Sequence, residues 1–176
     1  MCKLLGARDG KKKGYLADGV VKENERYVIA VNDAMLVRWP DQITGISQFP
    51  FPVEALMAVG PYQMKFDPNN LEKMVSAGHQ QRVAIPKPNG ASVPATAFFN
   101  QKSAPISAVM GITLREEVVL GRSHRNVLVY NPLATNPMPP KLITSQEHWV
   151  CDVFPDHYTI HRLDDEPFRG DFGPST

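Results

Sequence analysis

Residues 27–31 read YVIAV, a continuous apolar run that is followed by the turn formers Asn32 and Asp33. A strand with one wetted face alternates polar and apolar residues, whereas a strand covered on both faces reads as an unbroken apolar run. The run therefore predicts a central β-strand that is covered on both faces. Ile29, in the middle of the run, is expected to be almost fully buried.

Two later apolar runs predict neighbouring strands of the same sheet. Residues 106–112 read ISAVMGI and residues 127–130 read VLVY. Val109 is expected to be buried in the first of them. Ser107 is a possible nucleophile, but no Gly-x-Ser-x-Gly elbow surrounds it, so a core hydroxyl bonded to the backbone is the expectation.

Shorter segments predict the rest of the sheet. Residues 62–66 alternate and are expected to form a strand with a half-buried face, and residues 71–77 favour a strand over a helix. Other strands are expected at 83–85, and residues 148–153 and 157–163 are expected to form a hairpin.

Helices are expected to be few and short. Residues 1–21 have mixed helical character, which glycines weaken, and residues 53–59 predict a short helix. The chain has 16 prolines among 176 residues, against about 5% in average proteins. We predict an α+β (or α/β) fold with a mixed β-sheet, few short helices and long Pro-rich connections. A single globular domain over residues 1–163 and a flexible tail over residues 164–176 are expected.

Charge and cysteine content narrow the function classes. There are 19 basic and 18 acidic residues, which argues against binding to nucleic acid through bulk charge. Cys2 and Cys151 have no CxxC spacing, so they predict two inert thiols in a reducing cytosol. The sequence shows no signal peptide and no run of the ~20 apolar residues that a membrane span needs. We expect a cytoplasmic protein that makes no membrane contact.

The sequence contains no complete catalytic or metal-binding pattern. Pro40-Asp41 resembles the start of a nuclease metal motif, but no Glu-x-Lys or Asp-x-Lys strand follows it at a suitable distance. His157 and His161, placed on one strand, would have Cα atoms about 13 Å apart, which is too far to share an ion. The sequence therefore predicts no catalytic residue, no metal site and no cofactor, and favours a chain that is not an enzyme by itself.

A few basic residues are candidates for contact with nucleic acid. Lys11, Lys12 and Lys13 form a short run, and Arg122 and Arg125 lie in a polar connection. Lys and Arg side chains of this kind neutralise backbone phosphates. The alternative for both groups is an ordinary solvated surface.

Three strings carry a resemblance to a known family. They are YVIAVND at 27–33, ISAV at 106–109 and VLVYNPLATNPMP at 127–139. Together they resemble the C-terminal half of an uncharacterised family of bacterial proteins, which is itself similar to the restriction-endonuclease-like (PD-(D/E)xK) fold. Tyr130 stands where that family usually has His, and Met138 where it usually has Leu.

The resemblance implies a nuclease-related domain with possible contact to DNA. It also implies that the chain begins after the strands that hold the catalytic metal, so no catalytic residue can be carried over. The alternative is a protein-interaction module or a self-associating structural domain that uses a sheet edge or Pro-rich loops. A sheet with missing neighbours beside residues 27–31 would expose unpaired backbone groups. We therefore expect a homo-oligomer, most simply a two-fold dimer, or a partner protein.

Overall fold

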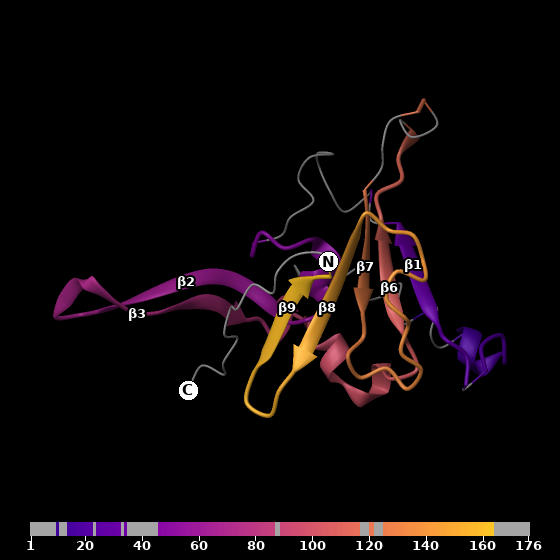
Figure 1. Ribbon diagram of the computed structural model, residues 1–176, viewed down its shortest axis with the longest axis horizontal. Coiled ribbons are helices and arrows are strands. Elements are labelled where there is room, and N and C mark those ends of the chain that lie inside the picture. Colours follow the sequence, from indigo (N-terminus) through magenta and orange to yellow (C-terminus); the bar gives the residue numbers. More distant parts are fainter. Residues whose placement is uncertain are drawn as a thin grey trace.

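The computed structural model describes residues 10, 14–22, 24–32, 34, 46–86, 89–116, 120–121 and 125–163. In this part of the chain, one five-stranded mixed sheet forms the body, and two-stranded hairpins extend from it (Figure 1). Helical segments are short, so the predicted mixed sheet with few short helices is confirmed, and the fold is mostly sheet. The expected tail at 164–176 lies outside the described residues.

The main sheet has the strand order β1-β6-β7-β8-β9. β1 and β6 are parallel, as are β7 and β8, whereas β6–β7 and β8–β9 are antiparallel. The predicted hairpin near the end of the chain is therefore confirmed as β8–β9. The strand bounds are Val28–Asn32 for β1, Ala108–Ile112 for β6, Asn126–Tyr130 for β7, Glu147–Val153 for β8 and Tyr158–Arg162 for β9.

The two central strands bury both of their faces. In β6, Val109 joins the larger core, while Ala108 and Met110 point into a smaller core on the opposite face. In β7, Val129 joins the larger core, and Leu128 joins the smaller core on the opposite face. The unbroken apolar sequences of these strands are explained by this burial on both faces.

The first strand differs from its prediction. Ile29 is 1% exposed and Val109 is 0% exposed, so both residues are buried as expected. However, β1 is the outermost of the strands that the structure describes in this sheet, and Ala30 is exposed between the buried Ile29 and Val31. The prediction of a central strand covered on both faces is wrong. The smaller core is centred on β6 and β7 and reaches β1 only at Val28.

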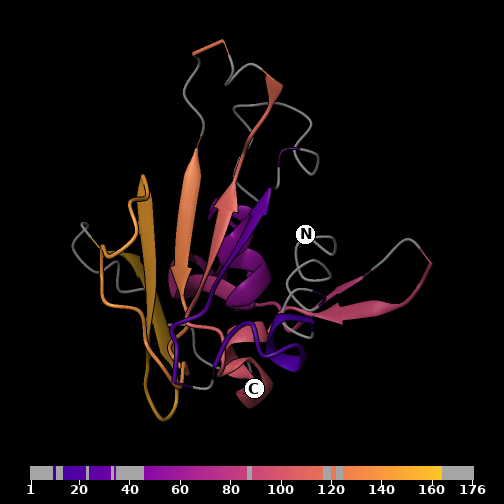
Figure 2. The ribbon, with the colours of Figure 1, turned by 90° about the vertical axis from the view of Figure 1, so that its right-hand side faces the viewer.

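Helix α2 (Phe51–Leu56) lies across one face of the sheet (Figure 2). It begins after Pro50, with Pro52 in its first turn, where the N–H that proline lacks has no intrahelical partner. Glu54 is fully buried, and one of its carboxylate oxygens accepts hydrogen bonds from the backbone N–H and the hydroxyl of Ser47. The helix therefore fixes the segment before it as well as the core below it.

The loop after β7 is fixed by buried polar groups. The Asn131 side-chain amide donates to the carbonyl oxygens of Ser103 and Ile106, 2.9 and 2.7 Å away. The Ser107 hydroxyl accepts from the backbone N–H of Tyr27 and donates to the carbonyl of Asn136. The expectation that Ser107 is a core hydroxyl bonded to backbone is confirmed.

The remaining elements lie between α2 and β6. Two hairpins form here, and their bases meet at Ala58. The backbone N–H of Ala58 donates to the carbonyl oxygen of Ala95, and the carbonyl oxygen of Ala58 accepts from the N–H of Arg82. The described helices include no segment long and apolar enough to cross a membrane. The element bounds are Val59–Asp67 for β2, Asn70–Gln81 for β3, Ala84–Pro86 for β4, Ser92–Pro94 for β5, Ala97–Phe99 for η1 and Gln101–Ser103 for η2.

Candidate interaction site

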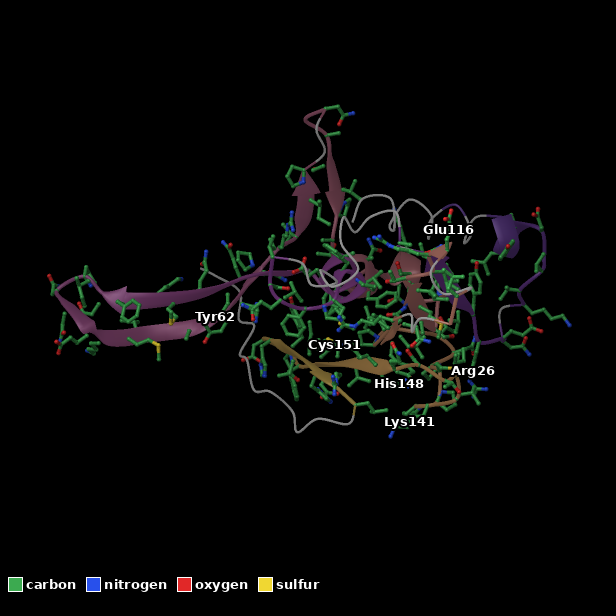
Figure 3. The ribbon with its side chains drawn as sticks, turned by 90° about the horizontal axis from the view of Figure 1, so that it is seen from above. Arg26, Tyr62, Glu116, Lys141, His148 and Cys151 are labelled. Carbon is green, nitrogen blue, oxygen red and sulfur yellow. The ribbon has the colours of Figure 1, made fainter. Side chains whose placement is uncertain are left out.

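The antiparallel hairpin of β2 and β3, here called the ribbon, projects from the body of the protein (Figures 1 and 3). Its tip is the turn at 67–70, where the backbone N–H of Asn69 donates to the Asp67 carboxylate. The strand predicted at 71–77 and the turn before it are confirmed. Because the ribbon is two strands wide and stands apart from the main sheet, both of its faces are in contact with solvent along most of its length.

The base of the ribbon is anchored to the main sheet. A chain of edge-to-face ring contacts runs from Trp149 on β8 through Phe49 and His79 to Tyr62, with centroid distances of 5.2, 5.0 and 5.2 Å. Gly60 lies against the opposite strand, where an added Cβ would come within 2.7 Å of the Gln80 carbonyl oxygen. Such close packing and ring contacts fix the direction in which the ribbon leaves the body.

One face of the ribbon is apolar. Tyr62, Met64 and Phe66 alternate along β2 and therefore share a face. On β3, Ala77 lies opposite Met64 and Met74 lies opposite Phe66, so the same face is apolar on both strands. Strands that alternate apolar and polar residues have one covered face. The alternation therefore predicts that another apolar surface packs against this face of the ribbon.

The other face of the ribbon is polar. Gln63 and Lys65 alternate with the apolar residues, and Ser76 lies opposite Lys65. The side-chain amide of Gln63 donates to the Gln80 side-chain oxygen, 3.4 Å away, across this face. The ribbon is thus amphipathic, with one face suited to water and one suited to an apolar partner.

The apolar face is uncovered. Six large apolar side chains of the ribbon are between 44% and 76% exposed, namely Tyr62, Met64, Phe66, Leu71, Met74 and Val75. The half-buried face predicted for residues 62–66 is therefore wrong, because these side chains leave the body of the protein. Together they expose on the order of several hundred Å² of apolar surface, which is the range of the largest patch on a typical monomer. An exposed apolar patch on a projecting element is the feature from which the proposal below is built.

The basic residues proposed for nucleic acid are mostly outside the described part of the chain. Four of them lie outside the described residues, namely Lys11, Lys12, Lys13 and Arg122. Arg125 is described, and its guanidinium forms an ion pair and a 2.7 Å hydrogen bond with the Glu147 carboxylate. Contact of Arg125 with a phosphate stays a prediction, and this pairing favours a structural role at the junction of β7 and β8.

The larger core contains one of the two cysteines. Cys151 is buried on β8, and burial raises the pKa of its thiol to about 12. The described residues include no group of three or more His, Cys, Asp or Glu side chains placed to hold a metal ion. Cys2 lies outside the described residues.

Cys151 should resist alkylation in the native protein. A raised pKa keeps the thiol protonated at pH 8, and the thiolate is the reactive form. In a Cys2→Ser background, iodoacetamide at pH 8 should leave the folded chain unmodified and should modify it fully in denaturant, as mass spectrometry can measure. Rapid labelling of the folded chain would show that Cys151 is accessible and ionised.

Comparisons of the chain with protein-family models, with curated proteins and with solved structures found no significant match. The sequence did contain the signal for the ribbon, namely the alternation at 62–66. What it lacked was any indication that these side chains would be exposed among the residues that the structure describes.

Proposed function

We propose that this chain is a protein-interaction module whose docking surface is the apolar face of the ribbon. The observation that carries the proposal is the exposure of Tyr62, Met64 and Phe66 on one face of a strand that leaves the body of the protein. An isolated two-stranded hairpin is only marginally stable in water, and a covering layer stabilises it. A partner that covers the face would supply that layer.

The anchored base supports the same proposal. The ring contacts from Trp149 to Tyr62 hold the ribbon in a set direction before any partner binds. A surface that is fixed in advance loses less conformational entropy on binding, which favours affinity. The exposed aromatic residues Tyr62 and Phe66 are of the type that contributes most to protein interfaces.

A dye-binding experiment tests whether the face is available. The variant Met64→Thr/Phe66→Thr removes two apolar side chains of the face and leaves Tyr62 at the anchored base, whereas Gln63→Thr/Lys65→Thr changes the polar face of the same strand. Dilute parent chain should enhance the fluorescence of an apolar dye, and the first variant should lose most of this enhancement while the second keeps it. Both variants should unfold within a few degrees of the parent.

Two results would contradict the proposal. Unchanged dye binding by the first variant would place the exposed apolar surface elsewhere. A large fall in the unfolding temperature of the first variant alone would show that these side chains pack within the fold.

The DNA contact expected from the sequence stays a second proposal with less support. Its candidate residues are Lys11, Lys12, Lys13 and Arg122, together with Arg125, which is paired with Glu147. An electrophoretic shift with duplex DNA at low salt tests it, because phosphate contacts weaken steeply with salt. A shift that is lost when Lys11, Lys12 and Lys13 are replaced by Ala would support it.

The chain should not cut DNA by itself. Metal-dependent hydrolysis needs carboxylates that hold the ion between protein and substrate, and the sequence shows no acidic-plus-Lys strand of the nuclease type. Plasmid incubated with purified chain and magnesium or manganese should stay supercoiled. Nicking that survives repurification and disappears on replacing one carboxylate would prove this wrong.

A further inference from the structure

We infer that the partner of the ribbon is a second copy of this chain, with two ribbons packed face to face about a two-fold axis. The inference rests on the proposed function and names its partner. Each ribbon exposes on the order of several hundred Å² of apolar surface, so two ribbons packed face to face approach the ~1,200 Å² in total at which specific interfaces begin. Two copies of this one patch are therefore large enough to form a dimer.

The patch is complementary to itself. Its middle is the pair of Met64 and Ala77, with Tyr62 one rung toward the base and Phe66 one rung toward the tip. A two-fold axis through the middle places the Tyr62 of each ribbon against the Phe66 of the other and brings the two Met64 side chains together. An interface about a two-fold axis uses the same patch on both copies, so a surface with an aromatic residue on each side of its centre can pair with itself.

The resulting layer has ordinary sheet geometry. Two antiparallel ribbons packed through their apolar faces form a four-stranded sandwich about 10 Å thick. Gln63, Lys65 and Ser76 would stay on the outside, in water, on both ribbons. Met64, with its flexible and polarisable side chain, is well suited to fill an irregular gap at the centre.

The charges of the ribbon are balanced. Between Val59 and Gln81 the ribbon carries Lys65, Lys73, Asp67 and Glu72, so its net charge is zero. Lys73 lies 3.8 Å from Asp67 within one ribbon. Two like surfaces with no net charge meet without repulsion, and such a surface gives no electrostatic attraction to nucleic acid or anionic lipid.

The tip disfavours insertion into a lipid bilayer. The turn at 67–70 reads DPNN, with one carboxylate and two amides. Polar groups of this kind are costly to place in hydrocarbon. Association of the ribbon with a second protein surface avoids that cost, because the tip stays at the rim of the sandwich.

Sedimentation and site-directed cross-linking together test the inference. At tens of micromolar, the parent chain should sediment as a dimer, with twice the 19.6 kDa of one chain. In a Cys2→Ser background, Met64→Cys lies at the axis, and Gln63→Cys is its matched control on the outer face. A bis-maleimide that spans about 10 Å should link Met64→Cys chains into dimers many times faster than Gln63→Cys chains.

The outcomes separate this inference from the proposed function. A monomer at every concentration, with dye binding still dependent on Met64 and Phe66, would overturn the second copy and leave an interaction module for a different protein. A monomer whose dye binding is independent of these residues would overturn both. A dimer in which the two cysteine variants link at equal rates would overturn the ribbon as its interface.

Discussion

Replacing Ile29 by alanine should lower the free energy of unfolding by about 2–4 kcal/mol. Ile29 is 1% exposed in the larger core, on the strand that pairs in parallel with β6. The substitution removes apolar burial and leaves a cavity, because its strand partner Val109 is itself held in a regular element. Chemical denaturation of parent and variant measures the difference.

Leu142→Ala is the matched control for Ile29→Ala. Leu142 is an exposed apolar residue in the loop before β8, so its truncation should change the free energy of unfolding by less than about 0.5 kcal/mol. If Ile29→Ala and Leu142→Ala unfold at the same denaturant concentration as the parent, β1 is not part of the core and the sheet order is wrong.

The double substitution Met64→Lys/Phe66→Lys should abolish self-association at concentrations where the parent is a dimer. It places four positive charges in the dry middle of the two-fold sandwich, and burial of unpaired charge is strongly unfavourable. The dissociation constant should rise by about 100-fold or more, which corresponds to about 2.7 kcal/mol. Sedimentation over a concentration series measures it.

Gln63→Lys is the control for this charge effect. It adds a positive charge to the same strand on the opposite face, beside Lys65 and away from the interface. Its dissociation constant should stay within a few-fold of that of the parent. Both variants should keep the circular dichroism of the main sheet, because they leave unchanged the His79 and Tyr62 rings through which the ribbon is anchored. A dimer that survives Met64→Lys/Phe66→Lys would rule out the ribbon face.

Most strand positions were predictable from the sequence because apolar runs with β-branched residues have few alternatives. The runs at 106–112 and 127–130 became the two central strands, and the pattern at 148–163 became the β8–β9 hairpin. Val109 is 0% exposed, as the run around it indicates. The local pattern sufficed to predict these strands, because the neighbouring strands and the layers that cover their faces belong to the same fold.

The prediction for residues 27–31 failed because the burial of a strand depends on which distant segments of the chain pack against it. The run is apolar, yet Ala30 is small enough to be exposed at little cost, and β1 is the outermost among the described strands of its sheet. An apolar run indicates which residues tolerate burial, and the placement of other segments decides which of them are buried. The same limit applies to the ribbon, whose alternation at 62–66 predicts a covered face but not the identity of the cover.

The candidate site was not predictable from residue types. The sequence indicated basic residues as candidates for contact with nucleic acid. Of these, Arg125 is paired with Glu147, and the others lie outside the described residues. An interaction surface made of Tyr62, Met64 and Phe66 has the composition of a core strand. Only the direction in which the ribbon leaves the body distinguishes the two (Figure 3).

Hydrogen–deuterium exchange of the ribbon amides at two protein concentrations tests the central claim most directly. Dimer formation orders and covers the ribbon, so amides at 62–66 and 74–79 should exchange more slowly at tens of micromolar than at high dilution. Amides of β6 and β7 should exchange at the same rate at both concentrations. Equal exchange of the ribbon amides at the two concentrations, with the chain dimeric at the higher one, would contradict the account.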